Sequence, residues 1–536
     1  MLFNSLTFLF FFPLGLLGYY VCPARLRHVY LLLVSAIFYM WWNPLYILLL
    51  YTSIILTYVC GRILGRTAPA PSLPASSEAP LAQPLPPGPP SGDASRPAQR
   101  SRPPRPARSR STYLRVAVIA ATLAINLTLL AVFKYNNFGA SLINRGFALF
   151  GLTAQIPHFD IILPVGISFF TFQALGYIID VYRGTVDAER NFVRYALFVS
   201  FFPQMVAGPI ERSRNLLSQI KETGRLKVGS FDDIYHGLAA IIWGFFMKVV
   251  ISDRVAILVD TVYDSWWNYG QSELALATVG FALQIYCDFW AYSIIAWGCG
   301  RMMGFKLVVN FEQPYFARSI REFWQRWHIS LSTWFRDYLY IPLGGNRKGR
   351  WRKYLNTMIV FVTSGLWHGA NLTFMVWGFL HGAYQVIGDM TKGIREKARL
   401  RLNVKVEAFS YRLLQTGITF VLVCVAWVFF RADSLTEALG ILGNLVSDPD
   451  PWLVFNGGLF DLGIDRPHFN VLILAVVVLF LVDRVRYRKG LHLAEYLRTQ
   501  NVWFRWAVLL VLLVSILLFG AYGPEYDAKQ FIYFQF

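Results

Sequence analysis

Apolar residues occur along the chain in long runs separated by basic or proline-rich stretches. A run of roughly 20 apolar residues is long enough to cross a bilayer as a helix. Such runs cover residues 2–21, 28–64, 113–133, 161–182, 234–251, 275–298, 354–387, 413–430, 471–485 and 503–521. A shorter apolar run, 195–210, is interrupted by prolines, and we expect it to be re-entrant. The pattern predicts an all-α polytopic membrane protein, a single domain over 1–536, with roughly 11–13 membrane segments.

The most informative part of the chain is its centre, where a basic helical stretch is followed by a long apolar run. From Ser319 to Tyr338, apolar residues recur three and four positions apart after an S-x-x-E start, which predicts one capped amphipathic helix. His328 falls on the border between its polar and apolar faces. The next apolar run, 354–387, carries His368 near its middle.

The net charge is +19, although only 15% of the residues are charged. Nucleic acid could explain such a charge, but the aromatic residues lie inside apolar runs and not among the basic ones, so we expect no nucleic-acid partner. Lys and Arg gather in cytoplasmic loops of membrane proteins. The segment 66–112 is rich in Pro and Arg and poor in large apolar residues, so we expect a disordered cytoplasmic loop within the domain. The five cysteines form no C-x-x-C pair, and we expect no metal site.

His368 is the first candidate for chemistry. A histidine inside an apolar run must be paired or face water, and an imidazole suits a general base. Asn371 lies three residues further on and can polarise a carbonyl or hold the imidazole. The alternative is a structural histidine inside a helix bundle. Asp288, in the run 275–298, is a functional candidate as an intramembrane carboxylate, or a hydrogen-bond partner for helix packing.

Eleven Lys and Arg residues lie between Arg301 and Lys353. A basic cytoplasmic surface that leads to a buried base suits an anionic donor whose phosphates stay outside, although the positive-inside rule also explains such a cluster. The sequence contains no nucleophile elbow and no phosphate-binding glycine loop. A base without a protein nucleophile favours direct transfer, in which a bound hydroxyl loses its proton and attacks an activated acyl group.

These segments resemble the membrane-bound O-acyltransferase family, in particular its bacterial branch that takes part in alginate O-acetylation. The matching segments are Arg321–Ser332, Trp334–Tyr340, Leu343–Arg347 and Gly365–Asn371, supported by Phe201–Gln204, Ala207–Ile210, Phe429–Ala432 and Phe531–Phe536. The resemblance implies a helical membrane fold with a through-going tunnel and two active-site histidines, which correspond to His328 and His368.

The resemblance also implies a reaction. Acetyl-CoA is the expected donor, consumed from the cytoplasm, with no permanently bound cofactor. The acceptor is expected to be an extracytoplasmic polysaccharide such as alginate, reached directly or through a periplasmic acetyltransferase partner, from the bacterial inner membrane. We expect His368 to be the base, His328 to assist it, and five neighbouring residues to bind substrate: Arg326, Trp327, Arg336, Trp367 and Asn371. The alternative from another class is a polysaccharide or lipid transporter without acyl-transfer chemistry.

Overall fold

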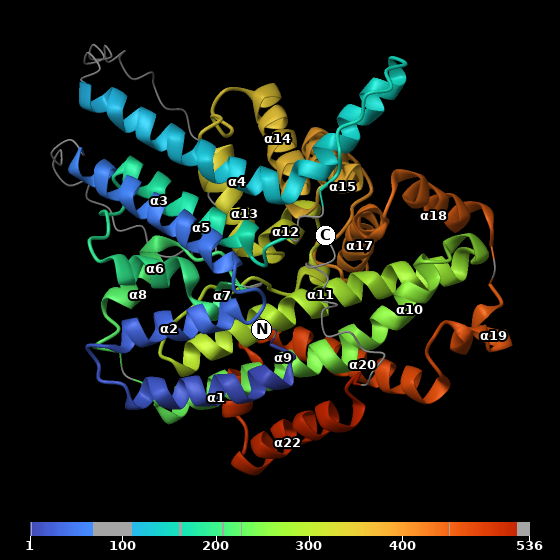
Figure 1. Ribbon diagram of the computed structural model, residues 1–536. Helices are drawn as coiled ribbons and strands as arrows, with labels where there is room; N and C mark the ends of the chain where they lie inside the picture. The colour runs from blue at the N-terminus through green and yellow to red at the C-terminus, as the bar shows by residue number, and fades with distance from the viewer. Residues whose placement is uncertain are drawn as a thin grey trace, which may run out of the picture.

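The computed structural model describes residues 1, 3–67, 110–159, 163–205, 208–226, 228–449 and 451–522. Within these residues the chain is helical and contains no strand, which confirms the all-α prediction (Figure 1). The elements of the first part are α1 (Leu6–Val21), α2 (Arg27–Met40), α3 (Tyr46–Arg66), α4 (Arg110–Leu149), α5 (Ile167–Arg183), α6 (Phe192–Ser200), α7 (Phe202–Met205), η1 (Ser213–Leu217) and α8 (Ser218–Lys221).

The elements of the middle part are α9 (Phe231–Phe245), η2 (Phe246–Ser252), α10 (Asp253–Tyr263), η3 (Trp266–Asn268), α11 (Gln271–Met302), η4 (Pro314–Phe316), α12 (Ile320–Arg326), α13 (Ile329–Phe335), η5 (Arg336–Tyr340), α14 (Arg350–His368) and α15 (Leu372–Met390). Those of the last part are α16 (Lys392–Arg401), α17 (Phe409–Arg431), α18 (Leu435–Ser447), α19 (Leu453–Asn456), η6 (Gly458–Asp461), α20 (Arg466–Lys489), α21 (Leu493–Arg498) and α22 (Val502–Phe519).

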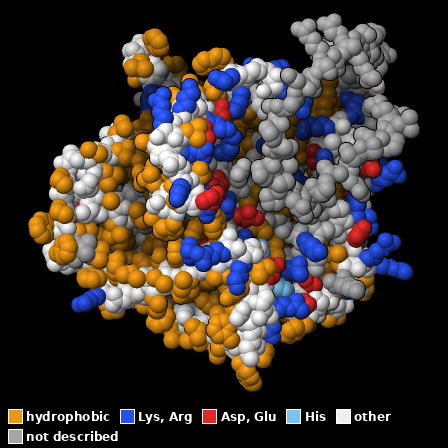
Figure 2. Space-filling model, turned by 180° about the vertical axis from the view of Figure 1, so that it is seen from behind, with side chains coloured by type: hydrophobic (Ala, Val, Ile, Leu, Met, Phe, Trp, Pro, Cys, Tyr) orange, Lys and Arg blue, Asp and Glu red, His pale blue; other side chains and the backbone are white. Residues whose placement is uncertain are grey.

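Seven helices among the described residues are long and apolar enough to cross a membrane. They are α3, α4, the nearly continuous run from α9 to α10, α11, α17, α20 and α22. Helix α22 carries large apolar side chains on its outer surface, as expected for a helix that faces lipid. Leu510, Val511, Leu517 and Leu518 are each at least 60% exposed. Apolar side chains also cover much of the face in Figure 2, with Lys and Arg grouped over part of it. A bilayer removes this apolar surface from water, so a polytopic membrane protein is confirmed.

The predicted disordered loop 66–112 falls mostly outside the described residues. Arg66 is the last residue of α3 and residues 110–112 belong to α4, while 68–109 are not described, so the loop stays a prediction. The terminal segment Phe531–Phe536 and Ala207, both part of the family resemblance, also lie outside the described residues.

The long helix α11 forms the centre of the packing. It packs against α9, α10 and η2 on one side and against α17 and α18 on another. Helices α12 to α15 gather beside it, and α4 crosses over them in Figure 1. Phe289 of α11 is completely buried and faces the central stretch, so the core reaches the segment that carries the candidate histidines.

The predicted single helix from Ser319 to Tyr338 is wrong. Helix α12 ends at Arg326, and α13 starts only at Ile329, because His328 has a left-handed backbone with φ of 44°. The loop before α12 supplies the hydrogen bonds that the break leaves open: the Ile329 amide donates to the Asn310 carbonyl at 3.0 Å, and the Glu312 amide donates to the Arg326 carbonyl at 2.9 Å. The break turns the His328 side chain into the core, where it is 0% exposed.

The apolar run 354–387 is a hairpin of two helices and not one segment with His368 in its middle. Helix α14 ends at His368, and the Asn371 side chain accepts from the Thr373 amide to begin α15. The two helices approach very closely, because a Cβ atom at Gly365 would lie 2.2 Å from the carbonyl oxygen of Phe374. The hairpin therefore places His368 at a turn, at the end of a helix.

Candidate active site

His368 is held from its own helix. Its Nδ1 lies 2.6 Å from the carbonyl oxygen of Ser364, one turn earlier in α14. A carbonyl oxygen can only accept, so Nδ1 carries the proton and Nε2 keeps its lone pair. The imidazole is 4% exposed and packs between the rings of Trp377 and Phe430. This is the tautomer that a general base needs.

His328 lies across from it. The ring centroids of the two histidines are 6.4 Å apart, and their planes are inclined by 81°. His328 packs against Phe289 with a centroid separation of 4.6 Å, and near Trp367 at 6.1 Å. Since a hydrogen bond spans about 3 Å, one substrate oxygen between the rings can contact both. The structure thus brings together the two histidines that the sequence singled out.

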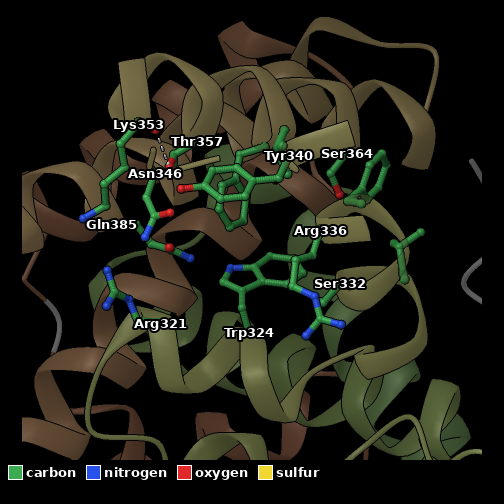
Figure 3. Close-up of a pocket in the computed structure, with 14 residues that line it drawn as sticks. Arg321, Trp324, Ser332, Arg336, Tyr340, Asn346, Lys353, Thr357, Ser364 and Gln385 are labelled. Carbon is green, nitrogen blue, oxygen red and sulfur yellow. Dashed lines mark hydrogen bonds between the residues drawn. The ribbon is translucent and has the colours of Figure 1, made fainter. Parts of the chain in front are cut away.

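A cavity of about 370 Å³ leads along α14 toward His368. Its lining includes Lys353, Thr357 and Ser364, which lie on one face of α14 over about 16 Å of helix. Figure 3 shows Arg321, Lys353, Asn346 and Gln385 grouped at one end and Ser364 at the other. Ser364 is 4% exposed and its carbonyl accepts from His368, so the inner end of the cavity lies beside the imidazole.

The lining of this cavity carries cations that reach solvent. The side chains of Arg321 and Arg336 are 61% and 60% exposed. Lys353 is more enclosed and pairs with Asp389 at 2.7 Å. Arg347, Lys348 and Arg350, which belong to the basic run of the sequence, do not line this cavity. The three cations that line it come from α12, η5 and α14, which are separate segments of the chain.

A second cavity, of about 210 Å³, lies beyond the end of α14. It is lined by Ala370, in the turn after His368, and by Lys134, Asn136 and Asn137 of α4. The first cavity ends at Ser364 and the second begins at Ala370, so His368 lies between the two along the chain. One cavity thus ends one turn before His368 and the other begins two residues after it.

The other predicted binding residues are placed differently from one another. Arg336 lines the first cavity. Trp327 is 1% exposed, stacks on Phe323 and packs at a tilt against Trp427, inside the core. Arg326 donates to the carboxylate of Glu322 and lies over the ring of Tyr487.

Trp367 and Asn371 flank His368 on either side. The ring of Trp367 packs against Phe169 and Phe172, 5.4 and 5.3 Å away between centroids. Asn371 donates to the carbonyl of Asp433 at 2.8 Å and so joins the hairpin turn to the end of α17. Both residues are close to His368 in the sequence, but the side chain of Trp367 packs against α5 and that of Asn371 bonds to the chain after α17.

Asp288 lies apart from the two histidines in a buried ion-pair cluster. The Lys248 ammonium of η2 lies 2.6 Å from the Asp288 carboxylate and 2.7 Å from that of Asp253. All three side chains are at most 3% exposed. The cluster joins α11 to the π-helix η2 and to the first residue of α10, which favours the packing role among the two alternatives for Asp288.

Sequence reasoning missed Lys134 and Tyr135 of α4. The Lys134 ammonium donates to the carbonyls of Trp367 and His368, at 2.7 and 2.8 Å, and the Tyr135 hydroxyl donates to that of Leu366 at 2.8 Å. The only signal in the sequence was a lysine directly after the apolar run 113–133, where a charged residue is costly without partners. Its partners lie more than 200 positions away, as the separations of these bonds record.

Comparison with known proteins adds independent information. The profile of the membrane-bound O-acyltransferase family matches residues 188–426. A probable alginate O-acetylase AlgI of Pseudomonas syringae pv. tomato is 37% identical over 451 residues, which cover 84% of this chain and 76% of that protein.

Two other relatives differ in the acceptor that their names give. A peptidoglycan O-acetyltransferase of Helicobacter pylori is 32% identical over 479 residues, covering 83% of this chain and 80% of the relative. A teichoic acid D-alanyltransferase of Bacillus subtilis is 28% identical over 232 residues, covering 42% of this chain and 58% of the relative. The region that matches the family profile, 188–426, includes both His328 and His368 and both helices of the hairpin, α14 and α15.

Proposed function

Because the chain belongs to the membrane-bound O-acyltransferase family, we propose that it is an O-acetyltransferase of the bacterial inner membrane. It takes acetyl from cytoplasmic acetyl-CoA and delivers it to an extracytoplasmic polysaccharide such as alginate, directly or through a periplasmic partner protein. The observation that carries this proposal is the pairing of His368 with His328, with a basic cavity that reaches Ser364, whose carbonyl accepts from His368, and a second cavity that reaches Ala370 in the turn after it.

The basic cavity suits the donor. The exposed cations Arg321 and Arg336 in its lining can bind phosphates, and the cavity extends along about 16 Å of α14 from Lys353 to Ser364. A long, narrow donor with a charged end and a reactive acyl end fits this layout. In this arrangement the thioester lies beside His368, while the nucleotide stays at the surface.

The chemistry then needs only the groups already in place. Nε2 of His368 takes the proton of the acceptor hydroxyl as its oxygen attacks the thioester carbonyl. The carbon–sulfur bond breaks, the ester forms, and the CoA thiolate recovers the proton from the imidazolium. His328, across the gap of 6.4 Å, contacts the carbonyl oxygen or the hydroxyl and holds it in line. Arg326, Trp327, Trp367 and Asn371 support this arrangement through the contacts described above.

The test is transfer by the protein itself. Membrane vesicles that contain the full chain, supplied with acetyl-labelled CoA and alginate, should yield labelled polymer that mild base releases as acetate. Vesicles with the His368→Ala protein are the matched control. The assay is repeated with a periplasmic extract on the acceptor side, and label on neither polymer nor periplasmic protein, under conditions where the wild-type protein is folded, would contradict the proposal and favour a transporter without acyl-transfer chemistry. Peptidoglycan, tested in parallel, decides whether another polymer is the acceptor.

A further inference from the structure

The carboxyl end of α14 is held by two consecutive residues of α4. Lys134 donates to the last two carbonyls of α14, those of Trp367 and His368, and Tyr135 donates to the carbonyl of Leu366 just before them. We propose that Lys134, with Tyr135, positions His368 for the transfer reaction. This inference rests on the proposed function, which makes His368 the base.

The end of a helix explains why these donors are needed. The last four carbonyls of an α-helix have no partner within it, and a buried carbonyl without a donor is costly. A cation next to this end also opposes the negative pole of the helix dipole. The chain turns at Gly369 straight into α15. Donors from α4 thus satisfy three successive carbonyls at this turn.

The hydrogen bonds from α4 act on the imidazole through the backbone of His368 itself. His368 is the last residue of α14, and its own carbonyl accepts from Lys134. Its ring is fixed at the other side, because Nδ1 donates to the Ser364 carbonyl. With both its backbone and its ring held, the imidazole has a single position facing His328. A displacement of about 1 Å in a reacting group can lower a rate about 10²-fold.

The chain offers a matched control on the same helix. Arg115 of α4 also donates to two carbonyls, that of Leu64, which is buried, and that of Tyr182, which is partly buried, at 2.8 and 2.7 Å. Neither carbonyl belongs to α14 or to the walls of the two cavities. Arg115→Met therefore removes the same kind of interaction without touching His368.

The experiment compares kcat and the acetyl-CoA KM of the variants in membrane vesicles with alginate as acceptor, per amount of folded protein. Lys134→Met should lower kcat about 10²-fold and leave the donor KM within about twofold. Lys134→Arg, which keeps the cation and its donors, should recover most of the loss, and Arg115→Met should retain a wild-type kcat. A purely structural role would lower the amount of folded protein and leave kcat unchanged, which would overturn the proposal.

Tyr135→Phe decides the question if Lys134→Met does not fold. It removes one hydroxyl and keeps the ring, and it should lower kcat about fivefold with the donor KM unchanged. A wild-type kcat for Tyr135→Phe would overturn the proposal in that case. A wild-type protein that transfers no acetyl at all shows that the proposed function has failed, and the inference falls with it. Wild-type transfer with an unimpaired Lys134→Met protein refutes the inference alone.

Discussion

His328 and His368 face each other with ring centroids 6.4 Å apart, although one directly precedes α13 and the other ends α14. The pairing depends on two interruptions of helical structure, the left-handed backbone at His328 and the turn after His368. Residues outside the ordinary helical and extended regions are found where structure serves a site, because their conformational cost has to be offset elsewhere. The two interruptions meet at this pair, and the two cavities reach residues close to His368 in the chain, Ser364 and Ala370.

The first prediction concerns the exposed cations that line the donor cavity. Replacing Arg321 and Arg336 with Gln removes its two most exposed cations. The acetyl-CoA KM should rise about three- to tenfold, and its dependence on salt should become weaker, because exposed charges are screened. Steady-state kinetics at several salt concentrations measures both effects.

The control for this prediction comes from the basic run nearby. Arg347 and Arg350 are exposed and do not line the cavity, so their change to Gln should leave the donor KM close to that of the wild type. An equal rise in KM for both pairs would mean that the overall positive charge of this surface, and not the cavity lining, attracts the donor.

The second prediction concerns the packing of the hairpin. Gly365→Ala places a methyl group 2.2 Å from the Phe374 carbonyl oxygen of α15, so the helices must move apart. We expect the free energy of unfolding to fall by about 1–3 kcal/mol and the melting temperature in detergent to drop. Gly417→Ala in α17 meets no atom within 4 Å and should be neutral or slightly stabilising. Equal stability of the two variants would contradict the close approach of α14 and α15.

The third prediction concerns the ion-pair cluster of Asp288. Lys248→Met leaves the carboxylates of Asp288 and Asp253 buried without their cation, which should cost about 3–5 kcal/mol of stability. Asp288→Asn keeps one ion pair and should cost less. Thermal unfolding in detergent measures these losses, and the melting temperature of Lys248→Met should be lower than that of Asp288→Asn. The acetyl-transfer rate per folded Asp288→Asn molecule should equal that of the wild type, and a large loss of that rate would instead give Asp288 a role in the reaction.

A surface pair provides the comparison. Arg498 and Asp232 lie 3.0 Å apart with side chains 51% and 53% exposed. Arg498→Met should cost less than about 1 kcal/mol, because water screens an exposed pair.

The sequence predicted the elements of the fold better than their ends. Long apolar runs identified the membrane helices, and the histidines stood out because a polar residue inside an apolar run is costly. The spacing from Ser319 to Tyr338 is helical on both sides of His328, so periodicity alone favoured one helix. The break is stabilised by Asn310 and Glu312, which belong to a preceding loop that the pattern could not connect to it.

The turn of the hairpin was indicated by local sequence, but the long apolar run 354–387 favoured one continuous segment. Gly369 and Asn371 are typical of a helix end and a helix start, and the structure uses both in this way. The role of Lys134 had no local signal, because its partners follow more than 200 residues later. The cations that line the donor cavity could not be predicted either. They come together only when α12, η5 and α14 pack, and the number of basic residues does not show which of them line the cavity.

The most direct test of the account is the acetyl-transfer rate of His368→Ala, measured per folded molecule in membranes beside His381→Ala. Both histidines are buried, but His381 accepts a hydrogen bond from the Trp324 indole at 3.2 Å and has no place in the proposed reaction. His368→Ala should lower the rate about 10²–10⁴-fold, as expected for the loss of a general base, while His381→Ala should stay within about tenfold of the wild type. A folded His368→Ala protein that transfers acetyl at the wild-type rate would contradict the assignment of the base and the account built on it.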